Sequence, residues 1–315
     1  MSRVVVAGGA GFLGSHLCDR LIERGDAVVC VDDLSTGSRD NVAHLLGHER
    51  FTLVVNDVSE KVELETDEKI DAVCNLASPA SPPAYLARPL DTLAVGSEGT
   101  RHLLELARAH EARFLMASTS EVYGDPEVHP QVESYRGNVD PTGPRSVYDE
   151  AKRFSESLTM AMHRTYGVDV GIVRIFNTYG PRLSPGDGRV VSNFIVQALR
   201  GDPLTVYGDG TQTRSLCYVD DEIAGLLALL DSSLTGPVNI GNPDEYTMLE
   251  LADVILKVTG SKSSLVFEPL PIDDPTRRCP DITLARAELG WSPTVELRDG
   301  IGRTMEYLAQ RIGIA

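Results

Sequence analysis

The sequence predicts an α/β protein built on a doubly wound parallel sheet, with a smaller C-terminal lobe. Short β-branched runs alternate with longer helical patterns through the first half of the chain, as in parallel strands joined by crossover helices. A glycine-rich turn follows the first apolar run, and after Ile175 the regular alternation gives way to a stretch rich in Gly and Pro. These observations place the second lobe over the carboxyl edge of the sheet, where open α/β folds bind their ligands.

Each element of the first half follows from its local pattern. The strand runs are short and apolar, and the helical patterns between them are long enough to return the chain to the same edge of the sheet. Strands are predicted at Arg3–Ala7, Ala27–Val31, Phe51–Val55, Ala72–Leu76, Arg113–Ala117 and Asp169–Ile175. Helices are predicted at 12–24, 91–110 and 144–167.

The second half is less regular. The stretch 176–189, FNTYGPRLSPGDGR, is rich in Gly and Pro and predicts irregular chain. Later elements are predicted as a helix at about Val190–Arg200, a short strand within 236–242, and helices at 247–259 and 296–311. We expect residues 1–180 to form one domain, to which 212–242 return, and residues 181–315 to form mainly the second lobe.

Composition and charge argue against several classes of function. No run approaches the ~18 apolar residues that a membrane-spanning helix needs. A net charge of −17 over 315 residues opposes nucleic-acid binding, which depends on clustered Lys and Arg. His44 and His48 have no third ligand nearby in the sequence, so no metal site is expected. Scattered cysteines predict reduced thiols in a cytoplasmic protein; they are Cys18, Cys30, Cys74, Cys217 and Cys279.

The N-terminal segment VVVAGGAGFLGSH carries a dinucleotide-binding pattern typical of the Rossmann fold. Gly8, Gly11 and Gly14 lie at a strand-to-helix turn, where a side chain would keep the backbone away from a pyrophosphate. The next strand ends in Asp32. Its carboxylate accepts hydrogen bonds from a ribose 2′-hydroxyl and repels a 2′-phosphate, so NAD is favoured over NADP. The other predicted cofactor contacts are Phe12, Leu13, Asp57, Val58 and Leu76, although an Asp after a strand is also a common helix cap.

The segment YDEAK places Tyr148 and Lys152 four residues apart, on one face of a predicted helix. A tyrosine with an unperturbed pKa near 10 is a poor base at neutral pH, but a nearby ammonium group and a positive nicotinamide ring both favour the phenolate. The pair could then remove a proton from a sugar hydroxyl while hydride leaves the same carbon. Such a pair also occurs by chance on solvated helices, but here it follows a dinucleotide motif.

These motifs together resemble the extended short-chain dehydrogenase/reductase superfamily of nucleotide-sugar enzymes. Within it the resemblance is closest to the UDP-glucuronate decarboxylase family, which forms UDP-xylose. The resemblance covers nearly the whole chain. It is carried by SPASPP (78–83), STSEVYGDPEVHPQ (118–131), GPRSVYDEAKR (143–153), RIFNTYGPR (174–182), DGRVVSNFIVQALRGDPLTVYGDGTQTRS (187–215) and DDPTRRCPDI (273–282).

The resemblance implies a role for each matched residue. Thr119 would hydrogen-bond the sugar C4 oxygen, Tyr148 would act as the base, and Lys152 would orient the nicotinamide ribose. Asn177, Arg189 and Arg214 would hold the UDP-sugar, with Tyr207 near the uracil. The arginines would supply the positive field that an acidic protein otherwise lacks. The remaining implied substrate contacts are Pro79, Tyr85, Arg182, Val190, Asn193 and Arg278.

Ser120 is the position at which the reaction is expected to be chosen. In the related 4,6-dehydratases this position is Asp, an acid that protonates the departing C6 hydroxyl. UDP-glucuronate has a carboxylate at C6, and a second carboxylate about 4 Å away would cost roughly 4 kcal/mol at an effective dielectric of 20, close to a thousandfold in binding. A serine removes that repulsion and can donate a hydrogen bond.

The implied reaction is oxidation at C4 followed by loss of carbon dioxide from the β-keto acid. Thr119 and Tyr148 would stabilise the charge that develops on the C4 oxygen. Glu121 would take part in ring movement and proton handling, or would simply be a buried acid with a partner. Arg278 would serve the diphosphate, the C5 proton or both. NAD would be restored within each turnover.

Three rival functions remain open at this stage. The first is a UDP-sugar 4-epimerase, which usually has a small or hydroxylated residue at the position of Glu121. The second is a decarboxylase that releases the 4-keto pentose without reducing it; Thr119, Ser120, Glu121 and Arg278 do not exclude it. The third is a non-catalytic NAD-sensing regulator, which typically loses Tyr148 or Lys152.

Two further expectations concern local structure and assembly. Gly96 stands where relatives commonly have Asn, which predicts a looser loop beside the nicotinamide. The helices at 91–110 and 144–167 resemble those that form a four-helix dimer interface in this superfamily, so a homodimer is expected. The same apolar faces would also fit the protein's own core.

Overall fold

Seven parallel strands form the central sheet of the computed structural model, which describes residues 1–62, 64, 68–270 and 277–314. Their order is β11-β6-β5-β4-β1-β2-β3, so the direction of winding reverses between β1 and β4. The doubly wound prediction is confirmed. The strands are β1 (Arg3–Ala7), β2 (Ala27–Asp32), β3 (Phe51–Val55), β4 (Ala72–Asn75), β5 (Arg113–Thr119), β6 (Val170–Ile175) and β11 (Val238–Ile240).

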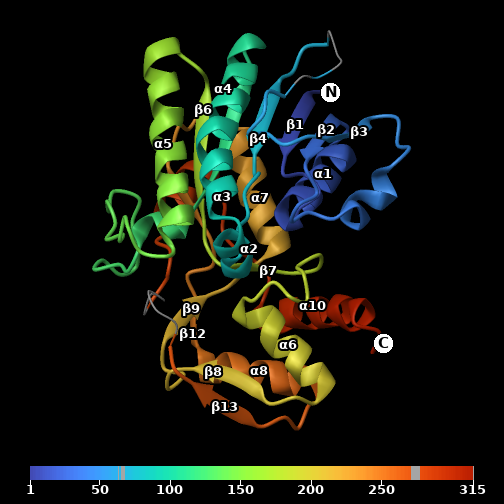
Figure 1. Ribbon diagram of the computed structural model, residues 1–315, viewed down its shortest axis with the longest axis vertical. Helices are drawn as coiled ribbons and strands as arrows, with labels where there is room; N and C mark the ends of the chain where they lie inside the picture. Colours follow the sequence, from blue (N-terminus) through green and yellow to red (C-terminus); the bar gives the residue numbers. More distant parts are fainter. Residues whose placement is uncertain (63, 65–67, 271–276, 315) are drawn as a thin grey trace.

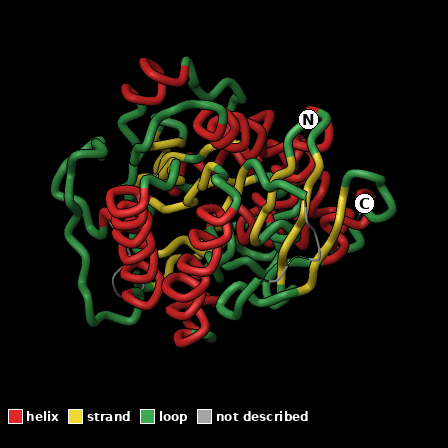
Figure 2. Tube along the Cα trace, turned by 90° about the horizontal axis from the view of Figure 1, so that it is seen from above, coloured by secondary structure: helices red, strands yellow, loops and turns green. Residues whose placement is uncertain are grey.

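Helices cover both faces of this sheet (Figures 1 and 2). Alternate residues of a strand point to opposite faces, and β1 shows this: Val4 and Val6 join one apolar cluster, whereas Val5 and Ala7 join another. The first cluster includes α1 (Phe12–Arg24) and α7 (Val219–Leu230), and the second includes α4 (Thr100–Ala109) and α5 (Ser146–Tyr166). Burial on both faces explains why the strands are almost continuously apolar.

A second lobe lies beyond the carboxyl edge of the sheet, in the lower part of Figure 1. Its apolar residues continue the cluster of β1 and α1, so the two parts share one core. Its helices are α6 (Val190–Arg200), α8 (Met248–Thr259) and α10 (Leu297–Arg311), and α9 (Thr283–Leu289) packs near β11. Short strand pairs complete it: β7 (Thr178–Tyr179) with β10 (Cys217–Tyr218), β8 (Leu204–Tyr207) with β13 (Leu265–Glu268), and β9 (Thr213–Ser215) with β12 (Glu245–Thr247).

The helix predicted at 91–110 is interrupted. The chain forms α2 (Pro82–Ala87), then α3 (Pro89–Ala94), a π-helical turn at Val95–Gly99, and α4. Gly96 lies in the π-helical turn against α5, where an added Cβ would lie 2.7 Å from the Cβ of Ala151. The Gly96 carbonyl accepts a hydrogen bond of 2.6 Å from Ser155 Oγ. The expectation of a looser loop is therefore wrong, because glycine allows this segment to pack tightly on α5.

Some elements were absent from the sequence prediction. Helix α7 is nearly all apolar after its acidic first turn, so it shows little of the periodicity that marks a surface helix. The 3₁₀ turns Arg39–Leu45 and Ser120–Tyr123 were also missed. Among the described residues, no helix is both long and apolar enough to cross a bilayer. The first four residues of DDPTRRCPDI lie outside the described residues.

Candidate active site

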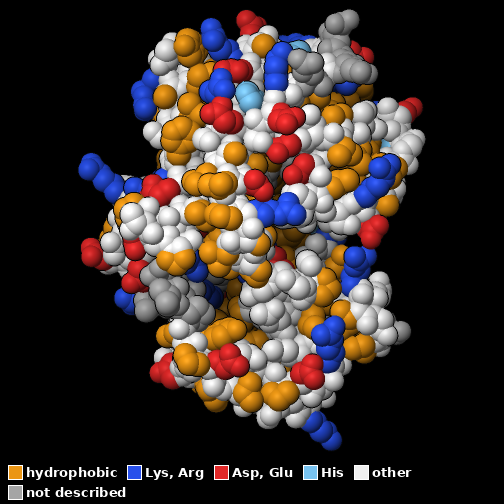
Figure 3. Space-filling model, viewed as in Figure 1, with side chains coloured by type: hydrophobic (Ala, Val, Ile, Leu, Met, Phe, Trp, Pro, Cys, Tyr) orange, Lys and Arg blue, Asp and Glu red, His pale blue; other side chains and the backbone are white. Residues whose placement is uncertain are grey.

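A cavity of about 900 Å³ opens between the carboxyl ends of the strands and the second lobe. In Figure 3 the surface is hollowed between the upper body and the lower lobe. All of the cofactor, catalytic and substrate residues predicted from the sequence line this one cavity, although they come from many elements. Their shared location is a finding of the structure, whereas the individual role of each residue stays a prediction.

The glycine turn between β1 and α1 leaves room for a ligand because it has no side chains. Gly8 has a positive φ of 75°, and its N–H donates to Val31 O at 2.8 Å. A Cβ on Gly14 would lie 2.0 Å from Gly8 O, so helix α1 could not start this close to the strand with any other residue. The open N-terminus of α1 then faces the cavity and suits a pyrophosphate.

Asp32 ends β2 beside this turn and is held by backbone amides. Its carboxylate oxygens accept hydrogen bonds from Ala10 N at 2.9 Å and Leu34 N at 2.8 Å. Burial raises the pKa of Asp32 above its usual value, and these hydrogen bonds oppose the shift. The fixed carboxylate is well placed to accept from ribose hydroxyls. The glycine turn and Asp32 together fit an adenine dinucleotide.

Tyr148 and Lys152 lie on the face of α5 that meets the end of β5. Lys152 Nζ donates to the Ala117 carbonyl at 2.9 Å, and burial lowers the pKa of Lys152 to about 8. Burial raises the pKa of the Tyr148 phenol, as does the Glu121 carboxylate, while a hydrogen bond with Thr119 lowers it. In the protein alone Tyr148 is therefore protonated near neutral pH, and a bound nicotinamide cation would favour its ionised form.

The strand tip that carries Thr119 and Ser120 is almost fully buried. Strand β5 continues two residues beyond its predicted end, and the Thr119 hydroxyl accepts a hydrogen bond of 3.3 Å from Glu121 N. Ser120 is only 2% exposed and still lines the cavity. The tip therefore presents two neutral hydroxyl groups close to Tyr148.

Glu121 lies between two guanidinium groups. Arg145 Nη2 donates to its carboxylate at 2.8 Å, and Arg278 Nη1 donates to its other oxygen. Burial alone would raise the pKa of Glu121, but the two arginines together hold it well below its usual range. Glu121 is therefore a carboxylate at physiological pH. The sequence reasoning missed Arg145, although it lies in GPRSVYDEAKR, three residues before Tyr148.

Arg189 and Arg214 line the part of the cavity formed by the second lobe. Arg189 forms a two-pronged ion pair with Asp187, with N–O distances of 2.5 and 2.8 Å. Arg214 is 9% exposed and donates to Thr213 O at 2.9 Å. Two fixed guanidinium groups give an acidic protein a local site for a diphosphate. Asp187, which fixes Arg189, was not predicted.

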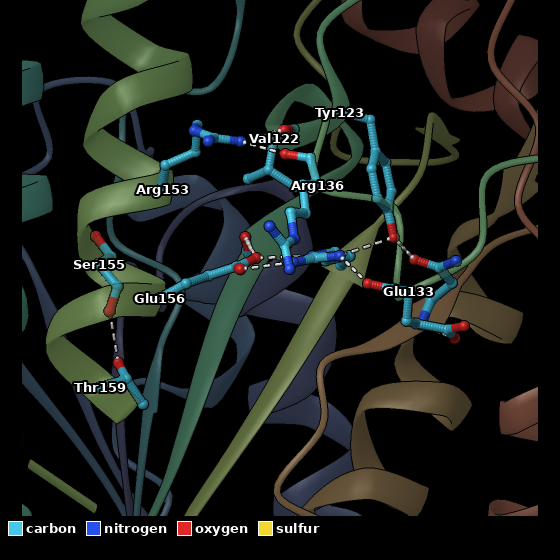
Figure 4. A network of polar contacts seen from close by, with 11 residues as sticks. Val122, Tyr123, Glu133, Arg136, Arg153, Ser155, Glu156 and Thr159 are labelled. Carbon is cyan, nitrogen blue, oxygen red and sulfur yellow. Dashed lines mark hydrogen bonds and ion pairs between the residues drawn. The ribbon is translucent and has the colours of Figure 1, made fainter. Parts of the chain in front are cut away.

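A buried polar network supports the strand tip and α5 (Figure 4). Ser118 Oγ donates to Glu156 Oε1 at 2.6 Å, and Arg174 binds both oxygens of Glu156 at 2.9 and 2.8 Å. Arg174 also donates to the Tyr123 hydroxyl at 3.0 Å, which donates to Asn239 Oδ1 at 2.7 Å. The network ties β5, α5, β6 and β11 together beneath the site.

Among the described residues, one group of side chains could hold a metal ion. His129, Glu245 and Cys279 bring their ligand atoms within 4.8 Å of one another. His129 Nε2 and Glu245 Oε2 already share a hydrogen bond of 2.8 Å. These residues lie far apart in the sequence, so no local pattern could have shown the cluster. All five cysteines are buried free thiols.

The fold and the site together define a dinucleotide-dependent enzyme of the extended short-chain dehydrogenase/reductase class. The chain belongs to the NAD dependent epimerase/dehydratase family, whose model matches residues 4–241. This confirms the prediction of NAD as the cofactor.

Known relatives narrow the class. The chain is 51% identical to UDP-glucuronic acid decarboxylase 1 of Arabidopsis thaliana, over 98% of this chain and 70% of that protein. Among solved structures, it resembles DesIV, a dTDP-glucose 4,6-dehydratase from Streptomyces venezuelae with NAD and TYD bound (TM-score 0.89, 30% identity, 99% of this chain and 98% of that chain). It also resembles the UDP-glucuronic acid 4-epimerase of Bacillus cereus in complex with UDP-glucuronic acid and NAD (TM-score 0.86, 30% identity, 98% and 99%). The resemblance inferred from the motifs is thus confirmed.

Proposed function

We propose that this protein decarboxylates UDP-glucuronate to UDP-xylose with NAD as a catalytic cofactor. The observation that carries the proposal is the strand tip, where a neutral Ser120 stands between Thr119 and a Glu121 carboxylate neutralised by Arg278 and Arg145. This arrangement accepts a sugar with an acid at C6 and lacks the acid that dehydration needs. The identity of about half to curated decarboxylases supports the same reaction.

The chain's own residues would carry the proton steps. Tyr148 would remove the proton from the C4 hydroxyl, and Thr119 would hold the same oxygen, while Lys152 fixes the ribose and favours the phenolate. Bound NAD would accept the C4 hydride and later return it. Once C4 is a ketone, the C5–C6 bond breaks because its electron pair delocalises onto the C4 oxygen, where Thr119 and Tyr148 stabilise the charge.

Two geometric features support binding of the nucleotide sugar in this cavity. Arg189 and Arg214 would hold the diphosphate, and Asn177 and Tyr207 line the cavity where the sugar and uracil would lie. Residues 1–180 with 212–242 would bind the dinucleotide, and residues 181–315 would mainly bind the UDP-sugar. The return of β11 to pair with β6 supports this division.

The protein would act as a homodimer in the cytoplasm. Large apolar side chains are exposed on the two segments expected to form the four-helix interface: Leu93, Phe154 and Tyr166. Leu86 and Leu90, just before the first of these segments, are exposed as well. A partner would cover this surface. Five free thiols support a reducing compartment.

A second candidate function is C4 epimerisation of UDP-glucuronate. The UDP-glucuronic acid 4-epimerase of Bacillus cereus, solved in complex with UDP-glucuronic acid and NAD, shares the fold at 30% identity. The decisive experiment is to incubate the protein with UDP-glucuronate and catalytic NAD and to analyse the products by NMR. Carbon dioxide with UDP-xylose would support the proposal. Carbon dioxide with a 4-keto pentose would mean that the protein decarboxylates the sugar but does not reduce the ketone. UDP-galacturonate without carbon dioxide would mean that the protein is an epimerase and not a decarboxylase.

A further inference from the structure

Tyr85, on α2, is packed against the predicted base but is not used by the reaction as described above. Its ring stacks on the ring of Tyr148, with 5.2 Å between centroids and an interplanar angle of 9°. The side chain is 2% exposed and lines the same cavity. The Tyr85 hydroxyl has no hydrogen-bond partner among the described residues.

A buried hydroxyl group without a hydrogen-bond partner destabilises the folded protein unless a ligand supplies that partner. The charges that act on this hydroxyl group belong to Arg145, Glu121, Asp149 and Arg278. All of these except Asp149 line the cavity. Burial raises the pKa of Tyr85 to about 12, so the phenol keeps its proton. The hydroxyl is therefore a shielded donor whose acceptor the protein does not provide.

The proposed reaction needs such a donor. When carbon dioxide leaves, C5 has lost a carbon substituent and must gain a proton before C4 is reduced. Glu121 is ionised and has no proton to give, and the guanidinium groups of Arg145 and Arg278 do not deprotonate in proteins. Tyr148 carries the proton taken from the C4 hydroxyl and must return it to the C4 oxygen when the ketone is reduced. Tyr85 is the remaining phenol beside Tyr148 in the described cavity.

We infer that Tyr85 is a second catalytic tyrosine, which protonates C5 after carbon dioxide is lost; this inference rests on the proposed function. The C5–C6 bond breaks, and its electron pair becomes the C4–C5 double bond of an enolate whose charge lies on the C4 oxygen. That pair then forms the C5–H bond as the O–H bond of Tyr85 breaks. The resulting phenolate, stabilised by the neighbouring arginines, recovers a proton from water after turnover.

Deuterium at C5 tests the inference directly. UDP-glucuronate is turned over in D₂O by the wild type and by Tyr85→Phe, which keeps the ring stack and removes only the hydroxyl. The wild type should place deuterium at C5 in one orientation. The variant should form UDP-xylose 10²- to 10⁴-fold more slowly, the usual loss for a general acid, with deuterium in both orientations. Tyr166→Phe, at the exposed end of α5, is the matched control and should behave as the wild type.

Each other result has a fixed meaning. If the Tyr85→Phe variant releases carbon dioxide but completes no UDP-xylose, the inference is supported, because the block follows decarboxylation. An unchanged rate overturns it. A slower reaction with deuterium in a single orientation also overturns the inference, since Tyr85 would then only bind substrate. A Tyr85→Phe variant that releases no carbon dioxide overturns it as well. Failure of the wild type to release carbon dioxide refutes the proposed function instead.

Discussion

The side chains of Glu121 and Arg278 form a buried ion pair although 157 residues separate them in the chain. One follows the tip of β5 and the other precedes α9. The pair therefore fixes the segment at 278 against the end of the central sheet, at the point where the sugar carboxylate is expected. Arg145 contacts the same Glu121 carboxylate from the start of α5.

The first prediction concerns the stability that this pair provides. Glu121→Gln should lower the free energy of unfolding at pH 7 by roughly 3–5 kcal/mol, because it leaves buried guanidinium groups without their carboxylate. The pKa of Glu121 is lowered in the folded protein. Ionised Glu121 therefore stabilises the folded protein fully at pH values above the pKa that it has in the unfolded chain. This stabilisation is lost as the pH falls through the lower pKa that Glu121 has in the folded protein.

Urea unfolding of both proteins at several pH values between 7 and 3 measures this. The difference in the free energy of unfolding between the wild type and Glu121→Gln should become smaller toward pH 3. Glu150→Gln, a change on the solvent side of α5, serves as the control and should show little difference at any pH. A gap for Glu121→Gln that stays constant with pH would contradict the buried pair as its source.

Lys152 gives a prediction of opposite sign. Its pKa is lowered to about 8 in the folded protein by burial, so the folded state is penalised for holding the charge at neutral pH. Lys152→Met should therefore raise the free energy of unfolding at pH 7 by roughly 3 kcal/mol and abolish turnover. This penalty disappears as the pH rises from 8 to the pKa that Lys152 has in the unfolded chain. Plots of the free energy of unfolding against pH for the wild type and Lys152→Met should therefore converge near pH 10. Curves that stay parallel would refute the shift.

Ser120→Asp tests the choice of substrate. A new carboxylate about 4 Å from the sugar carboxylate should raise the Kd for UDP-glucuronate close to a thousandfold, while UDP-glucose should be affected far less. Isothermal titration calorimetry with both nucleotides measures this. Ser120→Asn keeps the position neutral and polar and should retain most of the affinity. Equal losses for Asp and Asn would show that size rather than charge matters.

Gly96→Ala should destabilise the protein by about 1–3 kcal/mol, because its Cβ would meet the Cβ of Ala151 at 2.7 Å. Ala151→Gly removes the opposing methyl group and should rescue much of this loss in the double variant. The coupling free energy from denaturant unfolding of the four proteins measures the contact. Additive effects would mean that the two helices do not meet there.

Much of the site followed from local sequence pattern. Tyr148 and Lys152 share a helix face, and Gly8, Gly14 and Asp32 sit at strand ends, so periodicity and turn chemistry place them correctly. Asp187 lies in irregular chain, and Arg145 lies at the N-cap of α5, before the first full turn of the helix. At neither position does a helical or strand period indicate which charged side chain will be the partner. The strands of the second lobe are two to four residues long, too short for an alternating pattern to be recognised in the sequence. Tertiary pairing defines them.

The hydrogen bond between Ser118 and Glu156 has a mechanical consequence. Tyr148, Lys152 and Glu156 occupy successive turns on one face of α5, and Ser118 precedes Thr119 directly. Arg174 binds both oxygens of Glu156 at the same time. Helix α5 and the tip of β5 are therefore held together by one hydrogen-bonded network. A thermal displacement of α5 would therefore carry Thr119 with Tyr148. If these two side chains bind the C4 oxygen as proposed, they would stay aligned with each other through every stage of turnover.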